Sequence, residues 1–265
     1  MTRPSLSSAC SYSPDALPRH VAEAVWRGSE VSDAVSRTIS SGFPELDAQL
    51  PGRGWPTHCV TEILMPLAAL CEWRLLGRSV PGFTTGGGRV YLIAPPKQPH
   101  AGGLAQLGLS ADEVVWIDAS SPADRLWATE QIVKSDPSGA VLSWVAQARP
   151  EQIRRLQIHA QSCDAPVFLF RPVATLSEAS PAPLRVTAAL ATGWYLEVRI
   201  PKRRGASVPD PVYLAAIPTN LAAVLPPRLQ SIPAPAAALL REETSDARAL
   251  GRIAAPPSAG QPVSH

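Results

Sequence analysis

The densest group of cationic side chains in the sequence is Lys202, Arg203 and Arg204, which stand between an apolar β-type run and a turn containing two prolines. Cationic side chains neutralise phosphate groups, and three of them would contact about three phosphates. Such a loop would support weak binding of single-stranded DNA or of a protein partner, far short of sequence-specific recognition. The simpler interpretation of the same residues is a solvated loop.

Histidine and cysteine, which carry most nucleophilic and metal chemistry, are scattered along this chain. His58, His100 and His159 are widely separated and have no Asp or Cys at a spacing typical of a catalytic triad or a metal site. The four cysteines show neither CxxC nor Cys/His spacing. We therefore expect no catalytic residue and no metal ligand, and the cysteines favour reduced thiols in a cytoplasm.

Segment 65–72 follows the apolar run 60–64, at a position where a phosphate-binding loop would stand. In P-loop proteins a strand leads into GxxxxGK[ST] and a helix: the glycines admit backbone N–H groups to the phosphates, the lysine neutralises them, and the hydroxyl binds magnesium. This stretch resembles the strand and loop of RecA. On that alignment the two glycines fall on Met65 and Leu70, the lysine on Cys71 and the hydroxyl on Glu72.

Substitution at all four positions removes the chemistry of phosphate binding, so we expect no nucleotide cofactor. A carboxylate at position 72 would repel a phosphate by about 1 to 4 kcal/mol at about 4 Å. The aspartate that organises magnesium would end the strand at 140–142, but Ser143, Trp144 and Val145 stand there, and Asp136 precedes the strand. The alternative is that the segment was never a phosphate loop and that Glu72 is a first-turn helix glutamate, stabilised through the helix dipole by about 0.3 to 1 kcal/mol.

The elements that would position these residues alternate between β-type runs and helical patterns. Apolar β-type runs occupy 60–65, 90–94, 114–117, 140–145 and 167–170. Helix start signals stand at Ser121-Pro122 and Pro150-Glu151. This alternation predicts an α/β fold with a mostly parallel sheet flanked by helices. Further runs at 184–190, 194–200 and 212–217 predict antiparallel strands added at the C-terminal edge.

Length and composition favour one α/β domain with tails. We expect a flexible N-terminus over 1–17, a domain over 18–217, and a largely disordered, Pro/Ala-rich tail over 218–265 with a helix near 236–243. The net charge of +2 excludes attraction of the whole molecule to nucleic acid or to a membrane. Because the sequence has no secretory signal and no 18-residue apolar run, we expect a soluble, cytoplasmic protein.

Short stretches spread over about residues 20 to 217 resemble, in order and spacing, the ImuA family of RecA-like proteins. They are Val25-Trp26-Arg27-Gly28, Gly54-Trp55-Pro56, Thr61-Glu62, Arg74-Leu75-Leu76, Ala94-Pro95-Pro96, Ala128-Thr129-Glu130-Gln131, Arg154-Arg155-Leu156-Gln157, Phe168-Leu169-Phe170-Arg171-Pro172 and Lys202-Arg203-Arg204-Gly205. The resemblance implies a RecA-like fold with a degenerate P-loop. ImuA proteins often keep a glycine or two in this loop, whereas this chain has none between Gly54 and Gly77.

The resemblance implies a non-catalytic accessory protein of SOS-induced translesion DNA synthesis, the error-prone tolerance of DNA damage that causes mutagenesis. Its implied partners are ImuB, an inactive Y-family polymerase homologue, and the alternative DNA polymerase III alpha subunit, with RecA as a further candidate. One alternative is a cell-division inhibitor of the SulA type that binds FtsZ, but the length of the chain and the motif Lys202-Arg203-Arg204-Gly205 favour ImuA. A second alternative is a RecA-like ATPase with an atypical phosphate site.

Overall fold

Strand β3 (Val60–Met65) lies inside an eight-stranded mixed sheet, and all six of its residues are buried. The computed structural model describes residues 37–226. The strand order is β10-β9-β8-β3-β7-β6-β4-β5. The other strands are β4 (Val90–Ile93), β5 (Val114–Ile117), β6 (Ala140–Trp144), β7 (Val167–Pro172), β8 (Leu184–Leu190), β9 (Tyr195–Lys202) and β10 (Val212–Ala215).

The pairing of these strands confirms the predicted arrangement. Strands β8, β3, β7, β6, β4 and β5 are mutually parallel, and β9 and β10 add to one edge by antiparallel pairing. From β3 the chain continues to β4, which lies on the β7 side of β3 in the strand order. After β7 it crosses to β8, which lies on the other side of β3. In open α/β sheets, a crevice forms beyond the carboxyl ends of strands whose connections diverge in this way, and ligands bind there.

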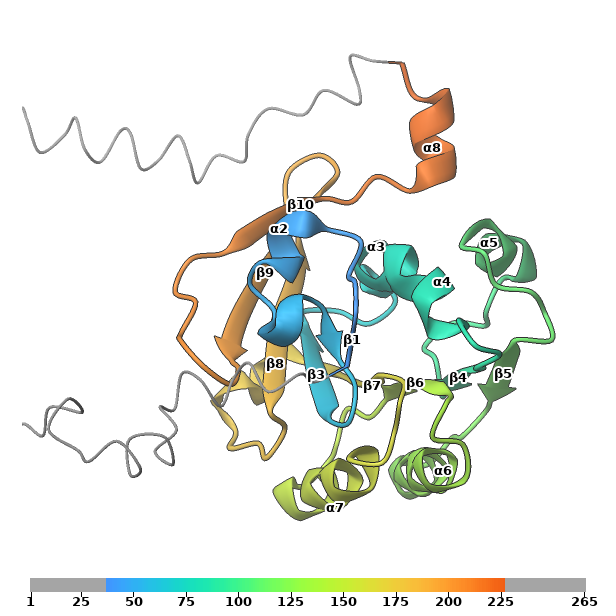
Figure 1. Cartoon of the computed structure of the whole chain (residues 1–265), viewed down its shortest axis with the longest axis vertical. Coiled ribbons are helices and arrows are strands. Elements are labelled where there is room, and N and C mark those ends of the chain that lie inside the picture. The colour runs from blue at the N-terminus through green and yellow to red at the C-terminus, as the bar shows by residue number, and fades with distance from the viewer. Residues whose placement is uncertain (1–36, 227–265) are drawn as a thin grey trace, which may run out of the picture.

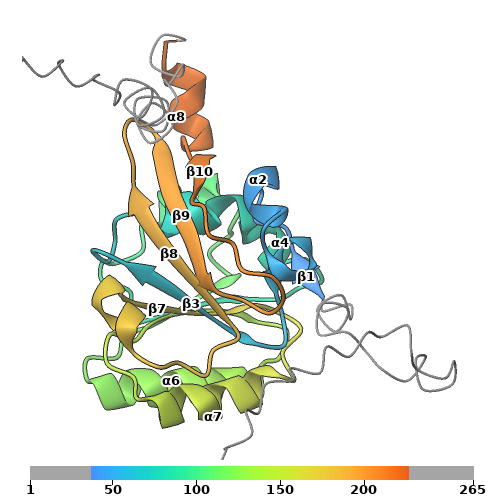
Figure 2. The ribbon, with the colours of Figure 1, turned by 90° about the vertical axis from the view of Figure 1, so that its left-hand side faces the viewer.

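Helices cover both faces of the sheet (Figures 1 and 2). One face carries α3 (Glu72–Leu76), α4 (Val80–Phe83) and α5 (Ala101–Gln106), whose apolar side chains join one core cluster. The other face carries α6 (Pro122–Ser135) and α7 (Pro150–Ala160), which contribute to a second cluster. On α7, Ile153, Leu156 and Ala160 are buried in this second cluster, while Arg154 and Arg155 are exposed.

Short elements complete the fold. They are β1 (Thr38–Ile39), α2 (Pro44–Asp47), the 3-10 turns η3 (Pro51–Arg53), η4 (Gly77–Ser79) and η5 (Val173–Ser177), β2 (Trp55–Pro56) and α8 (Thr219–Val224). Helix α8 falls within the predicted tail, so regular structure continues beyond the expected boundary at residue 217. The predicted N-terminal segment 1–17 and the predicted helix near 236–243 lie outside the described residues. Within residues 37–226, none of the helices has the length and apolar character needed to cross a membrane.

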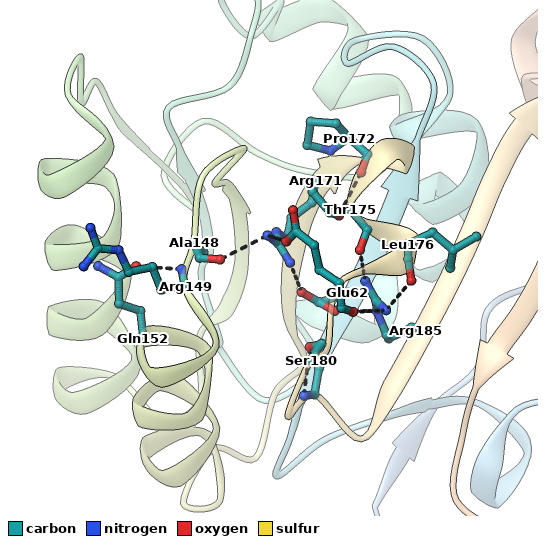
Figure 3. Close-up of polar contacts among 12 residues, drawn as sticks. Glu62, Ala148, Arg149, Gln152, Arg171, Pro172, Thr175, Leu176, Ser180 and Arg185 are labelled. Carbon is teal, nitrogen blue, oxygen red and sulfur yellow. Dashed lines mark hydrogen bonds and ion pairs between the residues drawn. The ribbon is translucent and has the colours of Figure 1, made fainter.

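A buried ion cluster joins the three central strands (Figure 3). Glu62 of β3 is completely buried, and its two carboxylate oxygens lie 2.7 Å from Arg171 Nη1 of β7 and 2.8 Å from Arg185 Nε of β8. Arg171 also contacts the carboxylate of Glu178 at 3.0 Å, so two carboxylates balance two guanidinium groups. Terminal N–H groups of the two guanidinium groups also donate to backbone carbonyls of Ala148, Thr175, Leu176 and Glu178. Because these ion pairs link β3 to β7 and to β8, the cluster can fix the register of β3 against both neighbours.

Candidate functional site: a loop closed by its own glutamate

The loop between β3 and α3 begins where the central strand ends. Its residues 66–70 are exposed, whereas Cys71 and Glu72, which follow them, are buried. Ala69 has a φ of +65°, a left-handed conformation that is strained for a residue with a Cβ atom. In this conformation its backbone N–H donates to Glu72 Oε1 at 2.6 Å. The loop therefore curls around the side chain of Glu72.

The Glu72 carboxylate receives three N–H groups. Besides Ala69, Trp144 Nε1 donates to Oε1 at 2.9 Å and the backbone N–H of Cys71 donates to Oε2 at 3.1 Å. Backbone N–H groups that converge between a strand and a helix are the donors that a P-loop offers to phosphate. Hydrogen bonds to a charged acceptor are roughly twice as strong as neutral ones. The carboxylate of the chain itself therefore uses two loop amides that an incoming phosphate would need.

The other three predicted loop positions take different places. Met65 is buried in the core, with its sulfur 3.4 Å from Cys71 Sγ, while Leu70 is 41% exposed. The loop amides therefore bind Glu72, and the loop is not filled by the side chains at the positions aligned with the P-loop glycines. Burial, together with the charge of Glu72, raises the pKa of the Cys71 thiol to about 12. Cys71 is therefore a neutral thiol where a P-loop would place a cation.

Trp144 fastens the closed loop to the sheet. It ends β6, at a position where a P-loop protein would carry the aspartate that organises magnesium, and its ring stacks on Phe170 of β7 at 4.6 Å between centroids. Asp136 lies before β6, at the opposite end of that strand from Trp144. There its carboxylate accepts from Tyr91 Oη and Ser138 Oγ, each at 2.7 Å. The role of Trp144 was missed in the sequence. The sequence signals it only by a tryptophan at the position where an aspartate would be expected.

The basic loop, Lys202 to Arg204, lies at the amino ends of the parallel strands, because it follows the antiparallel strand β9. Glu72 lies at their carboxyl ends. Lys202 Nζ donates to the carbonyl of Ser180 at 2.6 Å. The guanidinium of Arg203 donates to the carbonyls of Ala206 and Gln49. Burial, followed by the charge of Arg185, lowers the pKa of Lys202. Two of the three cations thus hold neighbouring chain segments, and Arg204 is exposed.

Replacing Arg203 by alanine should lower the free energy of unfolding by about 1 kcal/mol, because its guanidinium ties the loop after β9 to the segment after α2. Arg204→Ala is the matched control and should change stability by less than about 0.5 kcal/mol, as an exposed substitution does. Urea unfolding followed by circular dichroism measures both variants. Equal effects of the two substitutions would show that Arg203 has no anchoring role.

Each of the described histidines contacts a different group of the chain. His100 accepts from the backbone N–H of Gly103 at 2.9 Å and so caps α5. His58 Nδ1 lies 3.0 Å from the Gln161 carbonyl, and His159 lies 3.6 Å from the carboxylate of Glu130. In the part of the chain that the structure describes, no group of three His, Cys, Asp or Glu side chains is arranged to hold a metal ion.

A cleft of about 770 Å³ adjoins the closed loop. It lies at the carboxyl ends of β3, β4 and β6 and is lined by Ala69, Glu72 and Trp144, by α3 and α5, and by segments 95–100 and 216–218. We call it the α3–α5 cleft. Its place beyond the carboxyl ends of the strands and its size are typical of ligand sites in α/β proteins.

The described residues thus place a fully hydrogen-bonded carboxylate where the central strand meets its helix, beside a partly apolar cleft. Among known proteins, none of the family models matches this chain, and none of the curated proteins matches it either.

Proposed function

We propose that this chain is a RecA-like protein of the ImuA type that acts without catalysis in SOS-induced translesion DNA synthesis. Its role is to bind ImuB and, through it, the alternative DNA polymerase III alpha subunit. The observation that carries the proposal is the closure of the loop after β3 by Glu72, which takes up the amides of Ala69 and Cys71. A loop occupied in this way offers no free cradle to a nucleotide, and the function is left to binding surfaces.

The topology supports the RecA-like part of the proposal. A central parallel strand leads through a loop into a helix, and two antiparallel strands extend the sheet at the C-terminal edge. The stretches that resemble ImuA also meet in the folded chain. Glu62 pairs with Arg171, Gln157 accepts the backbone N–H of Val60 at 2.8 Å, and Trp55 packs edge-on against Phe168 at 5.3 Å. Stretches that are far apart in the sequence thus contact one another in the fold.

Exposed apolar side chains support a role in protein binding. Trp127 on α6 is 64% exposed and Ile158 on α7 is 58% exposed. Tryptophan is enriched at the energetic centres of protein interfaces, because it buries a large rigid surface. The outer face of α6 and α7 therefore offers anchors for a partner.

Isothermal titration with Mg-ATP tests the closed loop. We expect no binding heat up to millimolar nucleotide, whereas RecA titrated under the same conditions provides the positive control. Micromolar affinity would instead support the ATPase alternative and overturn the interpretation of Glu72.

Co-purification tests the partners. Tagged full-length chain should retain purified ImuB, and should retain the polymerase subunit only when ImuB is present. Substituting Trp127→Asp should weaken retention more than tenfold if the α6–α7 face is the interface, since loss of an interface anchor costs about 2 kcal/mol or more. Binding to FtsZ in place of ImuB would favour the SulA-type alternative.

A further inference from the structure

The α3–α5 cleft combines apolar walls with excess positive charge. Trp73 of α3, Leu107 after α5 and Ile217 contribute apolar surface, and Lys97 is exposed within the lining segment 95–100. Arg74 and Arg78 line the same cleft. The carboxylate of Glu72 is the acidic group of the lining, and it already accepts three hydrogen bonds from the loop and from Trp144.

The two arginines of the cleft are held by uncharged groups. Arg74 donates to the carbonyls of Trp194 and Ala216, and Arg78 donates to the carbonyls of Gly42 and Ala215. Carbonyl oxygens satisfy N–H donors but do not neutralise a net charge. Burial lowers the pKa of Arg74, as expected for a desolvated cation. Chemical complementarity therefore requires an occupant with apolar side chains and nearby carboxylates.

One segment of this chain has that composition. Leu239 and Leu240 are its adjacent large apolar residues, and Glu242, Glu243 and Asp246 follow within six positions. We propose that the α3–α5 cleft binds residues 236–246 of the same chain, with the two leucines on the apolar walls and the carboxylates beside Lys97, Arg74 and Arg78. This contact goes beyond the proposed function and does not depend on the identity of any partner.

The connection between cleft and segment makes the contact feasible. Pro218 lines the cleft, and α8, which follows it, lies over the end of the molecule that carries α3 and α5 (Figure 1). Leu239 lies thirteen positions beyond Pro226, the last described residue. Such a length spans up to about 43 Å at about 3.3 Å per residue. A tether of this length gives an effective concentration of about a millimolar, so even a weak contact would be populated.

Photo-crosslinking in the full-length chain tests the proposal. Benzoylphenylalanine placed at Gln106, an exposed residue of the cleft, should crosslink on irradiation to peptides that contain Leu239 and Leu240. Dilute protein and mass spectrometry distinguish crosslinks within one chain from those between chains. The paired substitution Leu239→Asp and Leu240→Asp should abolish the product, whereas Leu250→Asp, a matched change outside the segment, should leave it.

Charge reversal tests the electrostatic part. Lys97→Glu should reduce the crosslink yield about fivefold, as expected for loss of a surface ion pair. Adding Glu242→Lys to that variant should restore the yield to within about twofold, because Glu243 and Asp246 remain to face Arg74 and Arg78. Arg154→Glu, an exposed substitution on the opposite face of the sheet, is the control and should leave the yield unchanged.

Three outcomes would overturn the proposal. The first is a crosslink confined to other parts of the chain, or insensitive to these substitutions. The second is a product whose yield rises with protein concentration, which would identify a second copy as the occupant. The third is a crosslink to a co-purified protein in place of residues 236–246. None of these results depends on nucleotide or ImuB binding, so they are separate from the tests of the proposed function.

Discussion

Replacing Glu62 by glutamine should lower the free energy of unfolding by about 3 to 5 kcal/mol, because it breaks a buried ion pair. Glu62 is completely buried, and its oxygens contact Arg171 at 2.7 Å and Arg185 at 2.8 Å. The amide keeps the shape of the side chain but removes its charge. Arg171 would then keep the half-exposed Glu178 as its carboxylate partner, whereas Arg185 would lose the carboxylate that pairs with it. Urea denaturation followed by circular dichroism measures the loss.

A matched control separates burial from pairing. Glu197 pairs with Arg199 at 2.7 Å on the partly exposed strand β9, and Glu197→Gln should change stability by less than about 1 kcal/mol. A triple variant with Glu62→Met, Arg171→Met and Arg185→Leu should recover much of the loss, because it removes all three buried charges and the carboxylate of Glu178 that loses its partner is half-exposed. Equal effects of Glu62→Gln and Glu197→Gln would show that the central cluster contributes no more than a surface pair.

The sheet could be predicted from the sequence because its strands are marked by local composition. The expected runs 114–117 and 184–190 coincide with β5 and β8, and the antiparallel edge follows from the short turn at Gly193, which has a φ of +67°. Helix α5 was not predicted. It contains Gly102 and Gly103, which disfavour helix, and its cap is a histidine rather than Ser, Thr, Asp or Asn.

The candidate site was only half visible in the sequence. Glu72 can be picked out in the sequence, because it is an acid at the position that aligns with the magnesium-binding Ser or Thr of a P-loop. The direction of its side chain depends on Trp144, which is 72 positions away, and on the left-handed backbone of Ala69. Likewise, Arg203 looks like a solvated cation until the fold brings Gln49 beside it. Long-range hydrogen bonds of this kind leave no periodic pattern in a sequence.

Replacing Glu72 by alanine should lower the free energy of unfolding by about 2 to 3 kcal/mol, because the buried indole N–H of Trp144 and two loop amides lose a charged acceptor. Glu151→Ala is the matched control, since Glu151 is an exposed first-turn glutamate of α7 and contributes about 0.3 to 1 kcal/mol through the helix dipole. Guanidinium unfolding monitored by circular dichroism compares the two. Equal losses would favour the alternative in which Glu72 is an ordinary helix-start residue.

A double-mutant cycle isolates the contact that closes the loop. Trp144→Phe keeps an aromatic ring to stack on Phe170 but removes the N–H that donates to Glu72 at 2.9 Å. If the indole and the carboxylate act together, the losses for Trp144→Phe and Glu72→Ala should exceed the loss for the double variant by about 1.5 to 3 kcal/mol. Strictly additive losses would mean that the two side chains stabilise the fold independently. The loop would then be closed by its backbone alone, and Glu72 would not be the group that takes the place of phosphate.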